Sequence, residues 1–337
     1  MSSPEPYKPP AWEGLVPSSP VYLPAPPKLA NDVIAALGRG GQVCCLQNAG
    51  SANSRFLKFD GAEGDIWFMK LVSTKRTPEL EAAEALAGWL QAEGVRAIAA
   101  TSSIEMNGHR LWLYPYHKGR PPSPCNEDMA AIGSELGRLH RVLCRHPSAA
   151  KWQARTAARM ARLSAVRLAL ADGTLMAGPD PALLQRIARD WSIDFMPDRY
   201  VGTGECTPLH GDLNIHNIFL DNRGCTFLDF EDVFHSLLPS IFDLAMVSQR
   251  VALVGQSLTA VQPLSAVLFD AYGREVQYRP SLEQVPEALR GLALRALCIL
   301  AQNDPSAFHY QEWQKFFWLL THAESQRGAF AVMRDAS

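Results

Sequence analysis

The chain has 337 residues, of which 47% are hydrophobic and 20% charged, and its formal net charge is −2. This composition is typical of a globular protein with a large core, and the lack of a basic excess argues against binding to nucleic acid. No apolar run reaches the roughly eighteen residues of a membrane-spanning helix. Seven scattered cysteines without a C-x-x-C pair indicate reduced thiols. We therefore expect a cytoplasmic protein without a membrane segment.

Proline interrupts the first part of the chain repeatedly, from "MSSPEPYKPPAW" to "LPAPPK". Proline lacks a backbone N–H and has a fixed φ, which disfavours helix interiors and central strands. The same prolines stand where a signal peptide would have its apolar segment. Residues 1–40 are therefore predicted to form a proline-rich arm that lies extended along the surface.

Strand patterns dominate residues 41–116. "SRFLKFD" and "DIWFMKLV" are joined by "GAEG", and "TSSIEM" and "HRLWLY" flank Asn107-Gly108, a strong hairpin signal because both turn residues accept positive φ. Between these hairpins, a helical pattern begins near Thr77 and stops at Gly94. This region is predicted to be a small antiparallel sheet with one helix.

Helical periodicity dominates residues 117–337. In "EDMAAIGSELGRLHRVL", for example, Met129, Ile132 and Leu136 recur at spacings of three and four. One strand pair interrupts the helices, "HNIFL" and "CTFLDF", which are separated by the turn sequence "DNRG". The expected fold class is therefore α+β, with a small sheet lobe followed by a larger, mainly helical lobe.

The polar residues around this strand pair point to a chemistry. Asn217 and Asp229 are equally far from Arg223 in the turn, so a symmetric hairpin would place them opposite each other. An amide oxygen and a carboxylate are ligands that Mg²⁺ accepts. Asp212 lies five residues before Asn217 and would remain free to act as a base. A base beside a metal pair is what phosphoryl transfer to a hydroxyl requires.

Three short segments, "HGDLNIHN", "LDFED" and "FDLA", together resemble the aminoglycoside phosphotransferase and choline kinase family. This resemblance implies the two-lobed protein-kinase-like fold, with residues 41–116 as a nucleotide-binding lobe. It implies that Asp212 is the catalytic base and that Asn217 and Asp229 bind Mg²⁺. It also implies that Asp243, in "FDLA", braces the catalytic loop.

The resemblance extends to the nucleotide site. Lys70, in "WFMKLV", matches the family's lysine that holds the phosphates of ATP, with GTP as an alternative donor. Its partner is expected on the following helix, with Glu84 preferred and Glu81 as the alternative. The other expected nucleotide contacts are a phosphate-covering loop and main-chain groups of the segment between the lobes: Gly50, Ser51 and Asn53 in the loop, and Tyr114, Tyr116 and His117 in the linking segment.

The acceptor is expected to be a small molecule with a hydroxyl, such as an aminoglycoside, an amino alcohol, a sugar or an amino acid. Only fourteen positions separate Asp229 from Asp243, and no Ala-Pro-Glu anchor follows, which disfavours a protein kinase. Unless the metal takes Glu231, the acids Glu231 and Asp232 favour a cationic or amine-bearing acceptor, with solvated or helix-capping acids as the alternative. A catalytically silent nucleotide-binding module is the alternative to an enzyme, and the oligomeric state is left open.

His140 and the aromatic residues near the end of the chain are expected to have structural roles. His140 is expected to pack or to form a hydrogen bond within its own helix. The aromatic residues near the end of the chain are expected to form a stripe that faces the core, with a substrate wall as the alternative. They are Trp313, Phe316, Phe317 and Trp318.

Overall fold

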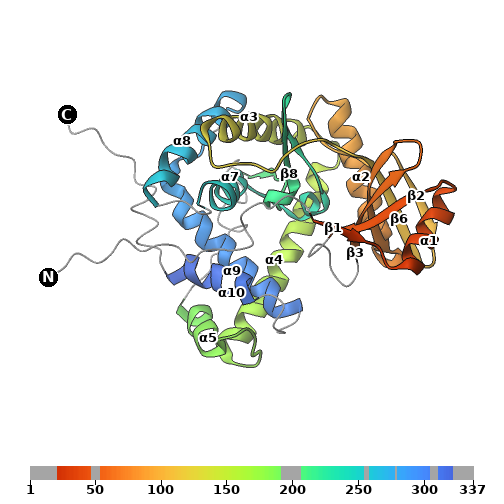
Figure 1. Cartoon of the computed structure of the whole chain (residues 1–337). Coiled ribbons are helices and arrows are strands. Elements are labelled where there is room, and N and C mark those ends of the chain that lie inside the picture. Colours follow the sequence, from red (N-terminus) through yellow and green to blue (C-terminus); the bar gives the residue numbers. More distant parts are fainter. Residues whose placement is uncertain are drawn as a thin grey trace. The chain divides into compact units, whose positions relative to one another are not determined.

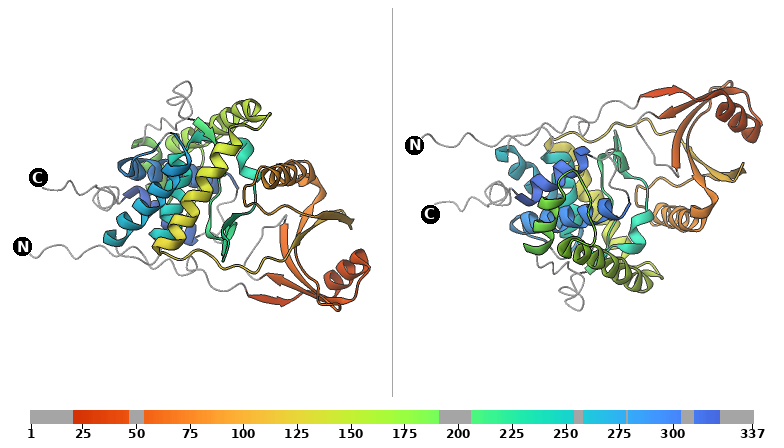
Figure 2. Two further views of the ribbon diagram at one scale, coloured as in Figure 1. Left: turned by 90° about the horizontal axis from the view of Figure 1, so that it is seen from above. Right: turned by 90° about the horizontal axis from the view of Figure 1, so that it is seen from below.

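The structure is a computed structural model, and it describes residues 21–46, 54–190, 206–253, 258–277, 279–303 and 310–321. The chain forms two compact units. We call residues 17–121 together with 219–231 the sheet unit, and the remainder the helical unit. Figures 1 and 2 show the elements of both units.

The sheet unit contains a six-stranded antiparallel sheet with the strand order β1-β2-β3-β4-β6-β5. Its strands are β1 (Tyr22–Pro24), β2 (Gly41–Leu46), β3 (Ser54–Gly61), β4 (Ile66–Ser73), β5 (Ser102–Met106) and β6 (His109–Pro115). The hairpin between β5 and β6 turns at Asn107 and Gly108, which have φ angles of 49° and 74°. Both hairpins predicted from the sequence are therefore present.

Helices α1 (Pro27–Leu37) and α2 (Thr77–Ala92) cover opposite faces of this sheet, as Figure 2 shows. Side chains alternate between the two faces along a strand. In β4, Met69 packs in the core cluster that includes Val33 of α1, whereas Val72 packs in the cluster with Leu80 of α2. Lys70 stands at the same parity as Val72, so the alternation assigns it to the face that α2 covers.

The proline-rich segment departs from its prediction after residue 20. Within the described part, β1 pairs with β2 from Tyr22 to Pro24, and α1 follows at once. Proline is compatible with the first turn of a helix, where its missing N–H would have no intrahelical partner. Pro27 occupies that position, and Gly38, with a φ of 63°, ends the helix. Residues 21–40 are therefore part of the sheet unit rather than of an extended arm.

The strand pair around the turn at Arg223 consists of β8 (Ile218–Asp221) and β9 (Gly224–Phe227). Its residues from 219 onward belong to the sheet unit, although the sequence placed them in the helical lobe. The backbone explains this, because Phe227 exchanges hydrogen bonds of 2.9 and 3.0 Å with the carbonyl of Arg96 and the N–H of Ile98.

The helical unit is built from seven α-helices in the described residues. They are α3 (Asn126–Leu143), α4 (Ala149–Asp172), α5 (Pro181–Asp190), α7 (Ile241–Val247), α8 (Leu258–Glu275), α9 (Val285–Asn303) and α10 (Tyr310–Thr321), labelled in Figure 1. Helices α3 and α8 lie side by side, and a Cβ at Gly133 of α3 would overlap the carbonyl of Leu268. Glycine there allows the two helices to approach closely.

Short elements complete the helical unit and frame its polar loop. Strands β7 (Cys206–Pro208) and β10 (Leu237–Pro239) pair with each other. The 3₁₀ helices η2 (Ile215–Asn217) and η3 (Glu231–His235) and the π-helical turn η4 (Ser248–Ala252) lie close to them in sequence. Every helix in the described ranges is too short or too polar to cross a lipid bilayer.

Candidate active site

The loop between β7 and η2 brings Asp212 and Asn217 together. The amide nitrogen of Asn217 donates to the backbone carbonyl of Asp212 at 2.8 Å and to its carboxylate at 3.2 Å. Asn214 donates to the same carboxylate at 3.1 Å, and its side-chain oxygen caps η2 by accepting from the N–H of His216. The nitrogen of Asn217 thus faces Asp212, and no hydrogen bond to its amide oxygen is found among the described residues.

Asp243 anchors this loop from α7. Its carboxylate is fully buried and accepts hydrogen bonds from the N–H groups of His210 and Gly211 at 2.8 and 3.0 Å. Asp243 therefore fixes the two residues that directly precede Asp212, which is the bracing that the resemblance implied. Hydrogen bonds to an ionised acceptor are among the stronger ones in proteins.

His140 of α3 is part of the same anchor. Its Nε2 lies 3.0 Å from the Asp243 carboxylate, and its Nδ1 lies 3.0 Å from the hydroxyl of Tyr272 in α8. His140 is buried, as expected, but the expectation of a hydrogen bond within its own helix is wrong, because both ring nitrogens contact other helices. A local pattern could not reveal this contact, because 103 positions separate His140 from Asp243.

Gly211 is required by the shape of the loop. Its φ is 81°, in the region that favours glycine, and a Cβ there would overlap the side chain of Ser236. The backbone conformation and the close side chain of Ser236 therefore both favour glycine at this position.

A cavity of about 130 Å³ opens beside Asp212 within the helical unit. It is lined by Arg159, Gly211, Asp212, Asp232, Met246, Gln249, Arg250, Leu292, Arg295, Ala296, Ile299 and Phe316. Burial raises the pKa of Asp212, and the negative charge of Asp232 raises it further. A carboxylate with a raised pKa is a better acceptor of a proton from a hydroxyl.

In the sheet unit, Lys70 lies between two carboxylates. Its Nζ is 3.1 Å from Asp229 and 2.6 Å from Glu231, and the other oxygen of Glu231 accepts from Arg76. The lysine side chain is buried. Burial disfavours its charge, but the two carboxylates outweigh this effect and raise the pKa of Lys70.

The predicted pair between Lys70 and Glu84 is not formed. Glu84 instead accepts from the backbone N–H of Ala100 at 2.6 Å and from the hydroxyl of Tyr114. Glu81, the alternative, pairs with Arg110. The two acids after β9 occupy the position next to the lysine, and Glu84 acts on it only through its charge.

Asp229 has an unusual backbone conformation. Its φ is 63°, and Asn107 is the other non-glycine residue with a positive φ in the described ranges. Strain of this kind is often found at functional sites. Asn217 ends η2, and Asp229 lies two positions beyond β9, so neither residue belongs to the strand pair that was expected to align them.

The other predicted nucleotide contacts divide into two groups. Gly50, Ser51 and Asn53 lie outside the described residues. Tyr114 is buried in β6 with its hydroxyl bonded to Glu84, so its side chain has a structural task. The ring of Tyr116 lies 5.5 Å from Nζ of Lys58. Burial lowers the pKa of the His117 side chain, and the backbone carbonyl of His117 accepts from the N–H of Gly119 at 3.1 Å.

The two acids that favoured a cationic acceptor are neutralised within the protein. Glu231 pairs with Lys70 and Arg76 in the sheet unit. Asp232 pairs with Arg159 in the helical unit, and this guanidinium helps to lower the pKa of Asp232 against the effect of burial. The sequence showed the acids but not their distant partners, and two carboxylates that are already paired with cations do not favour a cationic acceptor.

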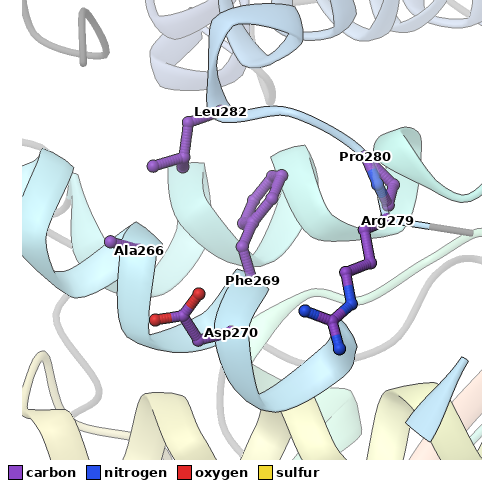
Figure 3. A pocket seen from close by; sticks show the side chains of 6 residues that line it. All are labelled: Ala266, Phe269, Asp270, Arg279, Pro280 and Leu282. Atoms are coloured by element: carbon purple, nitrogen blue, oxygen red, sulfur yellow. The ribbon is translucent and has the colours of Figure 1, made fainter. Parts of the chain in front are cut away.

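The aromatic stripe of α10 is buried, as expected, although Phe316 also lines the cavity beside Asp212. A second cavity, of about 240 Å³, adjoins α8 and is shown in Figure 3. It is lined by Ala266, Phe269, Asp270, Arg279, Pro280 and Leu282. None of these residues is a candidate base or metal ligand from the sequence.

The chain belongs to the phosphotransferase enzyme family, which it matches over residues 46–274. Two solved structures with a similar fold are spectinomycin phosphotransferase with ADP and spectinomycin, and amicoumacin kinase with AMP-PNP and Ca²⁺. The first is 11% identical with a TM-score of 0.54, covering 88% of this chain and 98% of its own. The second is 13% identical with a TM-score of 0.55, covering 82% and 87%.

A type I macrolide 2'-phosphotransferase is also similar, at 15% identity and a TM-score of 0.53, with 90% of this chain and 98% of that chain covered. At such identities, the likeness supports the fold alone. The predicted α+β, protein-kinase-like fold is confirmed, and so is the prediction of a phosphotransferase at the level of the family. A search of curated proteins found no match.

Proposed function

We propose that the protein is a small-molecule kinase that transfers the γ-phosphate of ATP to a hydroxyl group. The observation that carries this proposal is the contact between Asp212 and Asn217 on a loop anchored by Asp243. A carboxylate with a raised pKa is thereby held next to an amide oxygen that is available to a cation. Phosphoryl transfer needs such groups for positioning and for charge neutralisation.

Each residue has a defined task in this proposal. Asp212 accepts the proton of the acceptor hydroxyl. Asn217 and Asp229 are the residues that would hold Mg²⁺, whose charge, when it is bound, neutralises the phosphates. Asp229 suits this role because its side chain is 33% exposed and one of its two carboxylate oxygens contacts Lys70. The donors are an amide and a carboxylate oxygen, as a hard cation requires.

Lys70 is proposed to bind the phosphate oxygens of the nucleotide, with Glu231 as its partner in the absence of nucleotide. Glu84 contributes negative charge near Lys70 and supports Tyr114. The predicted loop with Gly50, Ser51 and Asn53, and the main-chain groups of Tyr114, Tyr116 and His117, remain the proposed contacts to the phosphates and the base. GTP remains the alternative donor.

The cytoplasm is the proposed location, because MgATP is abundant there and all seven cysteines keep their thiols in the structure. The acceptor is proposed to be a small molecule. The short stretch between Asp229 and Asp243 leaves no room for the activation segment of a protein kinase.

The test is nucleotide binding followed by turnover. A ligand at about 100 times its dissociation constant stabilises the folded state by roughly 2.7 kcal/mol, so millimolar MgATP should raise the melting temperature. ATP with EDTA should do so much less, because Asp229 and Glu231 repel phosphates that carry no metal. Acceptor-dependent release of ADP should then appear with a hydroxyl compound. No shift with either MgATP or MgGTP would contradict the proposal.

A further inference from the structure

The cavity beside Asp212 has more cations than anions. Three guanidinium groups line it, from Arg159, Arg250 and Arg295, whereas its carboxylates are those of Asp212 and Asp232. Arg159 forms an ion pair with Asp232, which balances one charge of each sign. Asp212 is bonded to two amides. Arg250 and Arg295 therefore have no direct carboxylate partner among the described residues, and the cavity lining carries one positive charge in excess.

Arg295 lies in the middle of α9 and is only 7% exposed. Among the described residues, no hydrogen bond or ion pair involves its guanidinium, although Asp232 and Asp212 act on it through their charges. Burial lowers the pKa of Arg295 to about 10, so the group stays charged at neutral pH. A buried charge without a direct partner is costly, which suggests that it has another role.

Arg250 lies in the π-helical turn η4, and π-helical turns are frequent at functional sites. Its guanidinium lies 5.9 Å from the ring centroid of Phe316, another residue of the cavity wall. Within the described ranges no carboxylate contacts it directly, although its charge acts on Asp212. The positive charge of Arg250 attracts an anion, and this attraction adds to that of Arg295.

We propose that the phosphate acceptor carries an anionic group, a carboxylate or a phosphate, which Arg295 and Arg250 bind while the acceptor hydroxyl faces Asp212. This inference rests on the proposed kinase function. Arginine suits such a role because its planar fork of donors matches the oxygens of both anions. A polycationic aminoglycoside would instead place ammonium groups against two guanidinium groups.

The size of the cavity agrees with a compact ligand. Its 130 Å³ correspond to about four water molecules at roughly 30 Å³ each. This space holds one carboxylate or phosphate group and the carbon that bears the hydroxyl. The acceptor class that fits is therefore a small hydroxy acid or a hydroxyl compound with a phosphate group.

The experiment measures kcat/KM by ADP release at saturating MgATP for matched pairs of acceptors. The pairs are glycerate and glycerol, serine and ethanolamine, and glycerol 3-phosphate and glycerol, with choline and kanamycin as purely cationic compounds. The anionic member of a pair should be preferred by roughly 10- to 100-fold, as expected for hydrogen bonds to a charged group. Glycerate against glycerol 3-phosphate distinguishes a carboxylate from a phosphate.

Variants assign the preference to the arginines. Arg295→Gln and Arg250→Gln should each raise the KM of the anionic acceptor by about 10-fold or more and leave the KM of MgATP unchanged. Arg295→Lys keeps the charge but loses the fork, so it should recover part of the affinity. Arg186→Gln is the control, because Arg186 is exposed on α5 and does not line the cavity.

The melting temperature of Arg295→Gln distinguishes acceptor binding from a purely structural role of Arg295. Loss of a buried charge that lacks a direct partner should leave the melting temperature of Arg295→Gln equal to or higher than that of the wild type. A large fall in melting temperature with an unchanged acceptor KM would overturn the proposal. An increase in the KM of MgATP instead of the acceptor KM would also overturn it, because the arginines would then serve the nucleotide.

The result also separates this inference from the proposed function. If MgATP raises the melting temperature and neutral or cationic acceptors are used at least as well as their anionic partners, the kinase remains and the anionic acceptor is wrong. If no compound is turned over, the same pairs are compared by thermal shift in the presence of Mg²⁺ and AMP-PNP. Equal shifts within each pair would also contradict the inference.

Discussion

The two charged clusters of the protein balance their charges differently. In the sheet unit, Lys70 and Arg76 face Asp229 and Glu231, so two cations meet two anions in direct ion pairs. In the helical unit, one ion pair leaves Arg250 and Arg295 without direct carboxylate partners among the described residues. The charges of the first cluster are balanced, whereas the second cluster has an excess of positive charge.

This difference indicates how each cluster would treat a ligand. A nucleotide reaching the sheet unit must compete with Glu231 for Lys70, and its negative charge is repelled by two carboxylates unless Mg²⁺ accompanies it. An anionic ligand in the helical unit meets two arginines that no carboxylate contacts directly among the described residues, although the charges of Asp212 and Asp232 act on them from a distance. Metal dependence is therefore expected of the first cluster, and charge selectivity of the second.

Replacing Asp212 in the helical unit and Asp229 in the sheet unit should have the largest effects on activity. Asp212→Asn should lower kcat by roughly 10²- to 10⁴-fold while MgATP still binds, because general-base assistance acts mainly in the transition state. Asp229→Asn should lose both MgATP binding and turnover. Asparagine tolerates positive φ better than most residues, so this change should preserve the backbone at Asp229.

Nucleotide titration by calorimetry, together with steady-state kinetics, distinguishes the two variants. The proposed roles would be reversed if Asp212→Asn lost MgATP while Asp229→Asn kept both binding and turnover.

The anchor at Asp243 should give the next largest effect. In Asp243→Asn, the new amide nitrogen must face at least one of the donors from His210, Gly211 and His140, so a buried hydrogen bond is lost. The free energy of unfolding should fall by about 3 kcal/mol, and kcat should fall because the loop loses its position. Asp270→Asn, at an exposed site on α8, is the matched control and should change stability by about 0.5 kcal/mol or less.

Urea unfolding followed by circular dichroism measures this difference. Equal stabilities of Asp243→Asn and Asp270→Asn would contradict the anchoring role.

The residues that sequence analysis placed correctly are those defined by local patterns. Lys70 stands in a strand because "WFMKLV" is strongly apolar, and Asp212 and Asn217 meet because five positions of one loop separate them. The hairpin at Asn107 is specified by its own two turn residues.

The errors concern partners that are distant in the sequence. Glu231, rather than Glu84, contacts Lys70 across 161 positions, and α3 supplies the histidine that contacts Asp243. Arg295 stands in an ordinary helical pattern, so nothing in the sequence marked it. In the segment with Pro27, the prolines that suggested an arm are compatible with the first turn of a helix.

Replacing Gly211 by alanine should have a smaller effect on stability. The same replacement at Gly88 should change stability in the opposite direction. Gly211→Ala forces a Cβ into positive φ and against Ser236, which should destabilise the protein by about 1–2 kcal/mol and reduce kcat. Gly88→Ala, in an open position within α2, should stabilise it by roughly 0.5–1 kcal/mol and leave kcat unchanged. Melting curves and kinetics of both variants make the comparison. If Gly211→Ala were as stable and as active as Gly88→Ala, the conformation described for the loop at Gly211 would be contradicted.

The smallest effect is the pH dependence that Glu84 contributes in the sheet unit. Burial raises the pKa of Glu84, although the hydrogen bond from Tyr114 acts in the opposite direction. Between the unfolded pKa of about 4.3 and the higher folded value, the folded state keeps a proton that the unfolded state has lost. The free energy of unfolding therefore falls as pH rises through this window. Glu84→Gln should lack this fall, so its stability relative to the wild type should increase from about pH 4 towards neutral pH.

Tyr114→Phe should extend this pH window. It removes the hydrogen bond that holds the pKa of Glu84 down, so the loss of stability should extend to higher pH than in the wild type. Urea unfolding at a series of pH values gives the window for all three proteins. MgATP should still bind to Tyr114→Phe, because the expected contact to the nucleotide is through the main chain of this segment. A window displaced to lower pH would show that Tyr114 does not stabilise the charged form of Glu84. Loss of MgATP binding would show instead that the hydroxyl, and not only the backbone, takes part in the nucleotide site.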